Sequence, residues 1–224
     1  MKQMALDIGL PTGPTLANFC AGPNLDALRH LELWVGASAR SPVPTYLRGI
    51  SGSGKTHLLK AAREGLREQG ARVGWLDVNT LEPADYNESW AAVMLDDVHL
   101  YTAAQQHTAF NWFVNAQALQ RPVLAAGEFA PVELQLRDDL RTRLGWGHIF
   151  HLQPLSEAER RAVLRQAADA RGVFLSDEVM DFMLTRFSRD LASLMELLGL
   201  LDGYALQTKR AITIPLIKSM MDNA

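Results

Sequence analysis

The chain has 224 residues, of which 48% are hydrophobic and 21% charged, which excludes a disordered chain, a collagen and a coiled coil. Its 22 basic and 25 acidic side chains give a formal net charge of -3, so no global positive field exists to hold nucleic acid or an anionic membrane. Cys20 is the single cysteine, which excludes a disulfide framework. Asp7 lies where a signal peptide needs apolar residues, and we therefore expect a soluble, cytoplasmic protein without a membrane segment.

An extended arm and an α/β domain are expected first. Residues 1–24 are rich in proline and glycine, which interrupt regular structure and predict the arm. Residues 25–154 alternate helical patterns with short apolar runs. Such alternation predicts βαβ units and a parallel sheet covered on both faces. The five expected strands are residues 45–48, 72–78, 92–96, 122–126 and 148–152.

Helices flank these strands. One is expected at about residues 56–69, where Gly70 ends it, and the longest at about 103–120. The longest places Phe110, Phe113, Val114 and Leu119 near one face, which we expect to lie in the core.

The last part of the chain, residues 155–224, shows helical periodicity only. It begins at Ser156, which has the capping-box spacing from Glu159. The sequence therefore predicts a second, all-helical domain.

A complete GxxxxGKT motif lies between a predicted strand and a predicted helix, the context of a phosphate-binding P-loop. Its glycines let backbone amides point at phosphate, its lysine reaches the β- and γ-phosphates, and its threonine hydroxyl binds magnesium. A glycine-rich turn without a ligand is the less favoured alternative. We predict ATP or ADP with Mg²⁺ as ligands, bound by Gly49, Ser51, Gly52, Ser53, Gly54, Lys55 and Thr56.

Two acids end the apolar run 93–97, at the sheet edge where a nucleotide site holds its metal. Asp96 is the candidate magnesium ligand beside Thr56. Asp97 is the candidate for orienting the attacking water, although the longer Glu is more usual there. A compatible alternative is that the two acids cap the next helix.

Two arginines have two possible functions each. Arg143 precedes the last predicted strand, and Arg189 begins a helix of the second domain. Both can be solvated side chains, and by spacing alone that interpretation is favoured for Arg143. A guanidinium at Arg143 also suits charge neutralisation on a transferring phosphoryl group, often from a neighbouring subunit, and one at Arg189 suits a nucleotide sensor.

The order of these motifs, with Leu-Asp-Asp at 95–97, RxRLGWG at 141–147 and Arg-Asp-Leu at 189–191, resembles the DnaA/Hda family of AAA+ proteins over nearly the whole chain. The resemblance implies an AAA+ P-loop NTPase with a parallel five-stranded sheet and a C-terminal all-helical lid. It also implies that Arg143 is the arginine finger, Arg189 the sensor II arginine, and Phe19 part of the lead-in that packs beside adenine.

Two features resemble the Hda branch, whose members inactivate the initiator DnaA. Because the sequence ends at Ala224, directly after the expected lid, we expect no DNA-binding helix-turn-helix domain. Residues 3–8 resemble the peptide with which that branch binds the sliding clamp of DNA polymerase III (beta), although a disordered amphipathic tail is the alternative. Its candidate contacts are Gln3, Met4, Leu6 and Ile8.

The resemblance implies a function. The expected partners are ATP-bound DnaA and the clamp, with DNA contacted only indirectly and nucleoid association through the clamp. The implied function is negative regulation of replication initiation, through stimulated conversion of DnaA-ATP to DnaA-ADP. The sequence leaves open homo-oligomers, a DnaC-like helicase loader or other AAA+ adaptor, and a small-molecule P-loop kinase.

One motif departs from the family. The strand that should end in a polar sensor I residue has Leu-Ala-Ala-Gly-Glu at 124–128. A water-positioning hydroxyl is therefore missing unless Glu128 substitutes for it, and we expect weak intrinsic ATPase activity at most.

Overall fold

The computed structural model describes residues 13–186, 191–208 and 212–222. The described chain divides into two compact units. The first contains the residues up to Ile50 and Gly54–Gln153, and the second contains Ser51–Ser53 and the chain from Pro154 onward. Each unit is described by itself.

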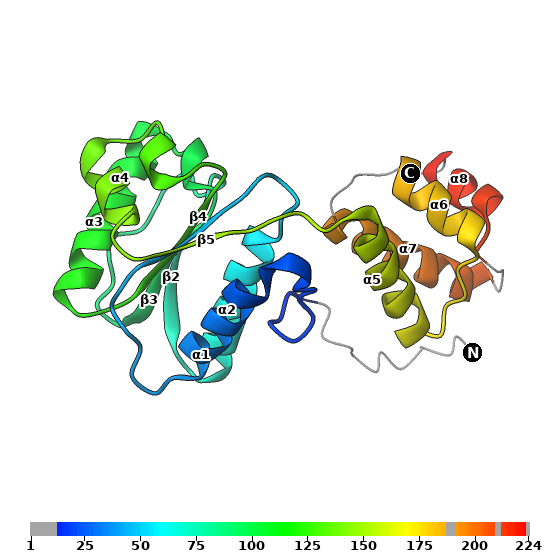
Figure 1. Ribbon diagram of the computed structural model, residues 1–224, viewed down its shortest axis with the longest axis horizontal. Helices are drawn as coiled ribbons and strands as arrows, with labels where there is room; N and C mark the ends of the chain where they lie inside the picture. Colours follow the sequence, from blue (N-terminus) through cyan, green and yellow to red (C-terminus); the bar gives the residue numbers. More distant parts are fainter. Residues whose placement is uncertain (1–12, 187–190, 209–211, 223–224) are drawn as a thin grey trace. The chain divides into compact units, whose positions relative to one another are not determined.

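A five-stranded sheet forms the centre of the first unit (Figure 1). Its strands are β1 (Thr45–Arg48), β2 (Arg72–Leu76), β3 (Trp90–Leu95), β4 (Val123–Gly127) and β5 (His148–His151). The order is β2-β3-β4-β1-β5, and every neighbouring pair is parallel. The predicted parallel five-stranded sheet is confirmed, with strand ends shifted by at most two residues.

Helices cover both faces of this sheet (Figure 1). The helices are α1 (Leu25–Gly36), α2 (Lys55–Glu68), α3 (Ala103–Ala118) and α4 (Asp138–Leu144). Side chains of β1 alternate between the faces, so Leu47 packs with α1 and α2 while Tyr46 packs with α3 and α4. Short 3₁₀ turns lie at Gly22–Asn24, Val98–Leu100 and Pro131–Glu133.

The buried face of α3 differs from the one expected. Ala109, Trp112, Phe113 and Ala116 are buried, whereas the side chains of Val114 and Leu119 are exposed. The spacing of the buried set follows the helical repeat, which turns Val114 away from Phe113. Trp112 was not among the expected core residues. Its indole N–H donates to the Ala84 carbonyl at 3.1 Å, which satisfies this polar group inside the core.

The second unit contains helices only among its described residues. They are α5 (Glu157–Ala170), α6 (Asp177–Arg186), α7 (Leu191–Thr208) and α8 (Ile214–Asp222). They enclose an apolar core that includes Leu164, Met180, Leu198 and Ile217. The predicted capping box begins α5: the Ser156 amide donates to the Glu159 carboxylate at 2.7 Å, and the Glu159 amide donates to the Ser156 hydroxyl at 3.3 Å.

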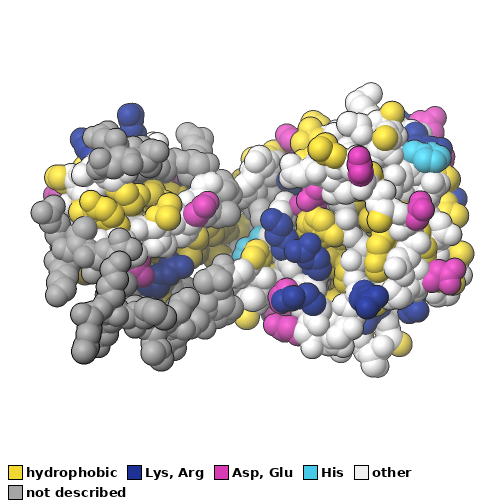
Figure 2. Space-filling view, turned by 180° about the vertical axis from the view of Figure 1, so that it is seen from behind, with side chains coloured by type: hydrophobic (Ala, Val, Ile, Leu, Met, Phe, Trp, Pro, Cys, Tyr) yellow, Lys and Arg dark blue, Asp and Glu magenta, His cyan; other side chains and the backbone are white. Residues whose placement is uncertain are grey.

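Acidic and basic side chains are mixed over the visible face of the first unit, with hydrophobic side chains between them (Figure 2). This mixture agrees with the small net charge of -3. In the described part of the chain, no helix has the length and apolar character needed to cross a membrane.

Candidate nucleotide-binding site

The GxxxxGKT segment forms the loop from β1 to α2, at the carboxyl edge of the sheet. The Gly49 amide donates to the Gly127 carbonyl at 3.2 Å, which ties the start of the loop to the end of β4. Gly52 and Gly54 have φ angles of 77° and 95°. Because residues with a Cβ rarely adopt such angles, this loop shape requires glycine at both positions.

Two polar side chains of this loop are buried. The Lys55 ammonium donates to the carbonyls of Gly49 at 2.7 Å and Ile50 at 3.2 Å. The Ser53 hydroxyl is buried and has no hydrogen-bond partner within the described residues. A buried hydroxyl without a partner is costly, and phosphate oxygens are acceptors that would satisfy it. The loop therefore fits a polyphosphate.

Asp96 follows β3 and is buried beside the loop. Burial and, to a smaller extent, the nearby Asp97 carboxylate raise its pKa to about 6. The Thr56 hydroxyl donates a hydrogen bond to the Asp96 carboxylate and opposes this increase, as does Lys55. Hydroxyl and carboxylate oxygens are the ligands that Mg²⁺ prefers, so this pair fits the predicted magnesium site.

Asp97 is a half-buried residue in the left-handed conformation, with φ 49°. Its backbone amide donates to the Asp96 carboxylate at 3.1 Å. It occupies the cap position of the turn at Val98–Leu100, but its side chain makes no capping hydrogen bond. Its carboxylate is thus not used by that turn.

Glu128 contacts His99, which was not among the expected site residues. The Glu128 amide donates to His99 Nδ1 at 3.3 Å, and the Glu128 carboxylate lies 3.5 Å from His99 Nε2. Since Nδ1 accepts, Nε2 carries the proton in the neutral ring. Glu128 is therefore held to the loop that follows β3.

Phe19 lies against the P-loop. A Cβ added to Gly54 would be 2.7 Å from the Phe19 ring, and this ring is centred 5.4 Å from the ring of His57. His57 was not among the expected site residues. Its position directly after the GKT triplet is the sequence signal that points to it.

Arg143 is on α4 and is half-exposed. Its guanidinium carbon lies 4.9 Å from the centre of the Trp146 ring and 5.4 Å from that of the Phe110 ring. The neighbouring Arg141 instead pairs with Asp138 at 2.7 Å. Within the described residues, Arg143 has aromatic contacts and no ion pair.

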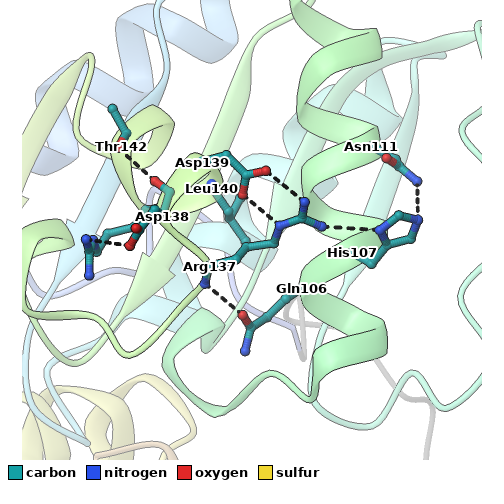
Figure 3. A network of polar contacts seen from close by, with 9 residues as sticks. Gln106, His107, Asn111, Arg137, Asp138, Asp139, Leu140 and Thr142 are labelled. Atoms are coloured by element: carbon teal, nitrogen blue, oxygen red, sulfur yellow. Dashed lines mark hydrogen bonds and ion pairs between the residues drawn. The ribbon is translucent and has the colours of Figure 1, made fainter.

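The start of α4 is held to α3 by Arg137 (Figure 3). The Arg137 side chain donates two hydrogen bonds to the Asp139 carboxylate, each 2.7 Å long, and one to His107 at 3.2 Å. Its amide donates to the Gln106 side chain at 3.0 Å. These bonds fix the helix that carries Arg143.

The remaining expected residues cannot be placed. They are Arg189, Gln3, Met4, Leu6 and Ile8, all of which lie outside the described residues.

Comparison with known proteins gives the family. The model of the Hda lid domain matches residues 157–221. An uncharacterized protein of Haemophilus influenzae is 33% identical over 236 residues, which cover 99% of each chain. The chain belongs to the Hda/DnaA-like AAA+ family. Residues 157–221 contain helices α5 to α7 and all but the last residue of α8, so these helices form the lid of this family.

Solved structures have the same fold. Domain III of the replication initiation protein DnaA from Thermotoga maritima has a TM-score of 0.75 and 20% identity, over 96% of this chain and 98% of that one. AMPPCP-bound DnaA from Aquifex aeolicus has a TM-score of 0.65 and 24% identity, over 87% of this chain and 66% of that one. The predicted AAA+ architecture is thus confirmed.

Proposed function

We propose that this protein binds an adenine nucleotide and acts as a DnaA-related negative regulator of replication initiation. In this proposal it docks on the DNA-loaded sliding clamp through residues 3–8 and stimulates hydrolysis of the ATP that DnaA holds. Contact with DNA is made through the clamp, which suits a net charge of -3.

The observation that carries the proposal is the state of Arg143. Its guanidinium is half-exposed, at the end of a fixed helix, and lies over the rings of Phe110 and Trp146. It makes no ion pair with the described residues, unlike Arg141, and is therefore available to a partner. An arginine supplied in trans to a transferring phosphoryl group accelerates hydrolysis by about 10³- to 10⁵-fold. That acceleration converts a long-lived ATP state into an ADP state.

The protein's own nucleotide serves as a conformational ligand in this proposal. The P-loop amides, Lys55 and Ser53 bind its phosphates, while Thr56 and Asp96 hold its magnesium ion, which supplies charge neutralisation. Glu128 is engaged with His99, and Gly127 has no side chain, so intrinsic hydrolysis is slow. The family resemblance favours ADP as the ligand of the active state.

The test is single-turnover hydrolysis of labelled ATP prebound to DnaA, in the presence of DNA-loaded clamp. We expect wild-type protein to stimulate hydrolysis, Arg143→Ala to abolish most of this stimulation, and the matched control Arg141→Ala to retain it, because Arg141 is engaged with Asp138. Equal stimulation by wild type and Arg143→Ala would remove Arg143 from its assigned role.

Deletion of residues 1–10 separates the alternatives. A clamp-dependent regulator loses stimulation when these residues are removed, whereas a helicase loader or other adaptor keeps its activity. No stimulation by wild-type protein would favour that second class.

A further inference from the structure

The residues just before Phe19 form a turn that is closed by its own hydrogen bonds. The Thr15 amide donates to the Asn18 side chain at 2.9 Å, and the Asn18 amide donates to the Thr15 hydroxyl at 3.1 Å. The Phe19 amide donates to the Leu16 carbonyl at 3.3 Å. The turn therefore has a defined shape that fixes the direction in which Phe19 leaves it.

His57 connects this turn to the P-loop helix. Its Nε2 lies 3.1 Å from the Thr15 carbonyl oxygen, which only accepts, so Nε2 carries a proton. Burial lowers the pKa of His57, and the bond to Thr15 opposes this decrease. The neutral ring with its proton on Nε2 makes this contact.

The same histidine also contacts Phe19. The two rings are tilted by 53°, with centres 5.4 Å apart. The Phe19 ring also fills the space above Gly54, where a Cβ would be 2.7 Å from it. The turn is thus attached at two places: Thr15 accepts a hydrogen bond from His57, at the start of the P-loop helix, and the Phe19 ring packs against Gly54 of the P-loop.

These contacts bear on which base the site accepts. In the proposed site, the loop amides and Lys55 bind phosphate, which is the same whichever base the nucleotide carries. Selection of the base depends on surfaces beside the loop, and an aromatic ring offers a flat apolar face on which a base stacks.

We propose that His57 is a positioning residue of the nucleotide site: it holds the Thr15–Phe19 turn against the P-loop and so sets the affinity and selectivity for adenine. This inference rests on the proposed nucleotide binding.

The experiment is calorimetric titration of the full-length protein with ADP, GDP and pyrophosphate. Loss of one hydrogen bond that places Phe19 is expected to weaken ADP binding by about three- to tenfold in His57→Ala. Pyrophosphate binding should stay within about twofold of wild type, because the P-loop itself is unchanged. The preference for ADP over GDP should fall.

Two further variants test the mechanism. His57→Gln keeps an N–H near the position of Nε2 and should recover most of the ADP affinity. Lys60→Ala, an exposed residue of the same helix, should bind all three ligands as wild type does. Thermal unfolding of each variant shows whether it is folded.

A double-mutant cycle with Phe19→Ala gives the sharpest result. Because His57 acts through Phe19, His57→Ala should add little to the loss of ADP affinity in Phe19→Ala protein. Additive losses, equal losses for ADP and pyrophosphate, or unchanged ADP binding by His57→Ala would each overturn the inference and leave nucleotide binding intact. Failure of wild-type protein to bind either ADP or pyrophosphate would overturn both.

Discussion

The Lys55 ammonium donates a hydrogen bond to the Gly49 carbonyl, 2.7 Å away in the same loop. A second bond to Ile50, at 3.2 Å, keeps this buried charge solvated by backbone oxygens. A nucleotide phosphate offers the same ammonium group a charged acceptor, and charge-assisted bonds are stronger than bonds to carbonyls. Binding of nucleotide therefore exchanges contacts within the loop for contacts with phosphate.

Lys55→Ala should remove most of the stabilisation by ADP. At an ADP concentration of about 100 times its Kd, wild-type protein gains about 2.7 kcal/mol, which raises Tm by about 5 to 10 °C. The variant should show less than about a quarter of that shift, because the phosphates lose their buried cation. Thermal unfolding with and without ADP measures the Tm shift of the wild-type protein and of the variant, with Lys60→Ala as the control. An unchanged shift in Lys55→Ala would contradict the assignment of the loop.

Asp96 makes a pH-dependent contribution to stability. Its pKa is about 6 in the folded protein and 3.8 when unperturbed, so between these values the folded state binds more protons than the unfolded state. The free energy of unfolding is therefore not reduced by Asp96 below about pH 4, and it falls as the pH rises through 6 and the buried side chain loses its proton. At pH 7 the buried carboxylate is therefore unfavourable by up to about 3 kcal/mol.

Asp96→Asn should remove this pH dependence. Without nucleotide or Mg²⁺, the variant should be more stable than wild type by about 1 to 3 kcal/mol at pH 7. The difference should nearly vanish at pH 4, where the wild-type side chain is also neutral. Urea denaturation at several pH values measures it, and a difference that stays constant with pH would contradict the raised pKa.

Much of the fold follows from local patterns. Each strand is a short apolar run between breakers, and the P-loop and capping box have fixed spacings, so all of them could be predicted. Contacts between distant residues could not. The bond from His57 to Thr15 and that from Glu128 to His99 join residues 42 and 29 positions apart, and nothing in their local sequence specifies the partner.

The expected core face of α3 was wrong in part for a related reason. Val114 and Leu119 have the right chemistry for a core, yet Trp112 and Ala116 occupy it. Hydrophobicity alone could not choose between overlapping faces, because the choice depends on partners such as the Ala84 carbonyl that binds Trp112.

Trp146→Ala should weaken stimulation of DnaA without affecting the fold. Trp146 is 57% exposed, and its ring lies over the Arg143 guanidinium. Loss of an exposed cation-π contact of about 0.5 to 1 kcal/mol should lower the rate of hydrolysis of DnaA-bound ATP about two- to fivefold. Arg143→Ala should lower it much further. Trp146→Phe should retain most activity, and Leu33→Ala, an exposed apolar residue of α1, is the control. A Trp146→Ala rate equal to that of wild type would show that the contact is unimportant.

Gly127→Ala should destabilise the first unit because Tyr46 occupies the space beside Gly127. A Cβ at Gly127 would be 2.2 Å from the Tyr46 hydroxyl oxygen and 3.1 Å from Val98. That hydroxyl donates to the Phe129 carbonyl at 2.9 Å, so the new methyl group displaces a partly buried hydrogen bond as well as atoms. We expect a loss of about 2 to 4 kcal/mol in the free energy of unfolding.

A second substitution separates the clash from other effects. Tyr46→Phe alone should cost about 1 kcal/mol, since it leaves the Phe129 carbonyl without its donor. Tyr46→Phe also removes the atom that the Gly127→Ala methyl group meets. The loss in the free energy of unfolding of the double variant should therefore be smaller than the sum of the two single losses, by about 1 kcal/mol or more. Urea denaturation of the three variants measures this coupling. Gly36→Ala, where nothing lies within 4 Å of the added carbon, should change stability little. Strictly additive losses would mean that the Tyr46 hydroxyl does not determine the need for glycine at the end of β4.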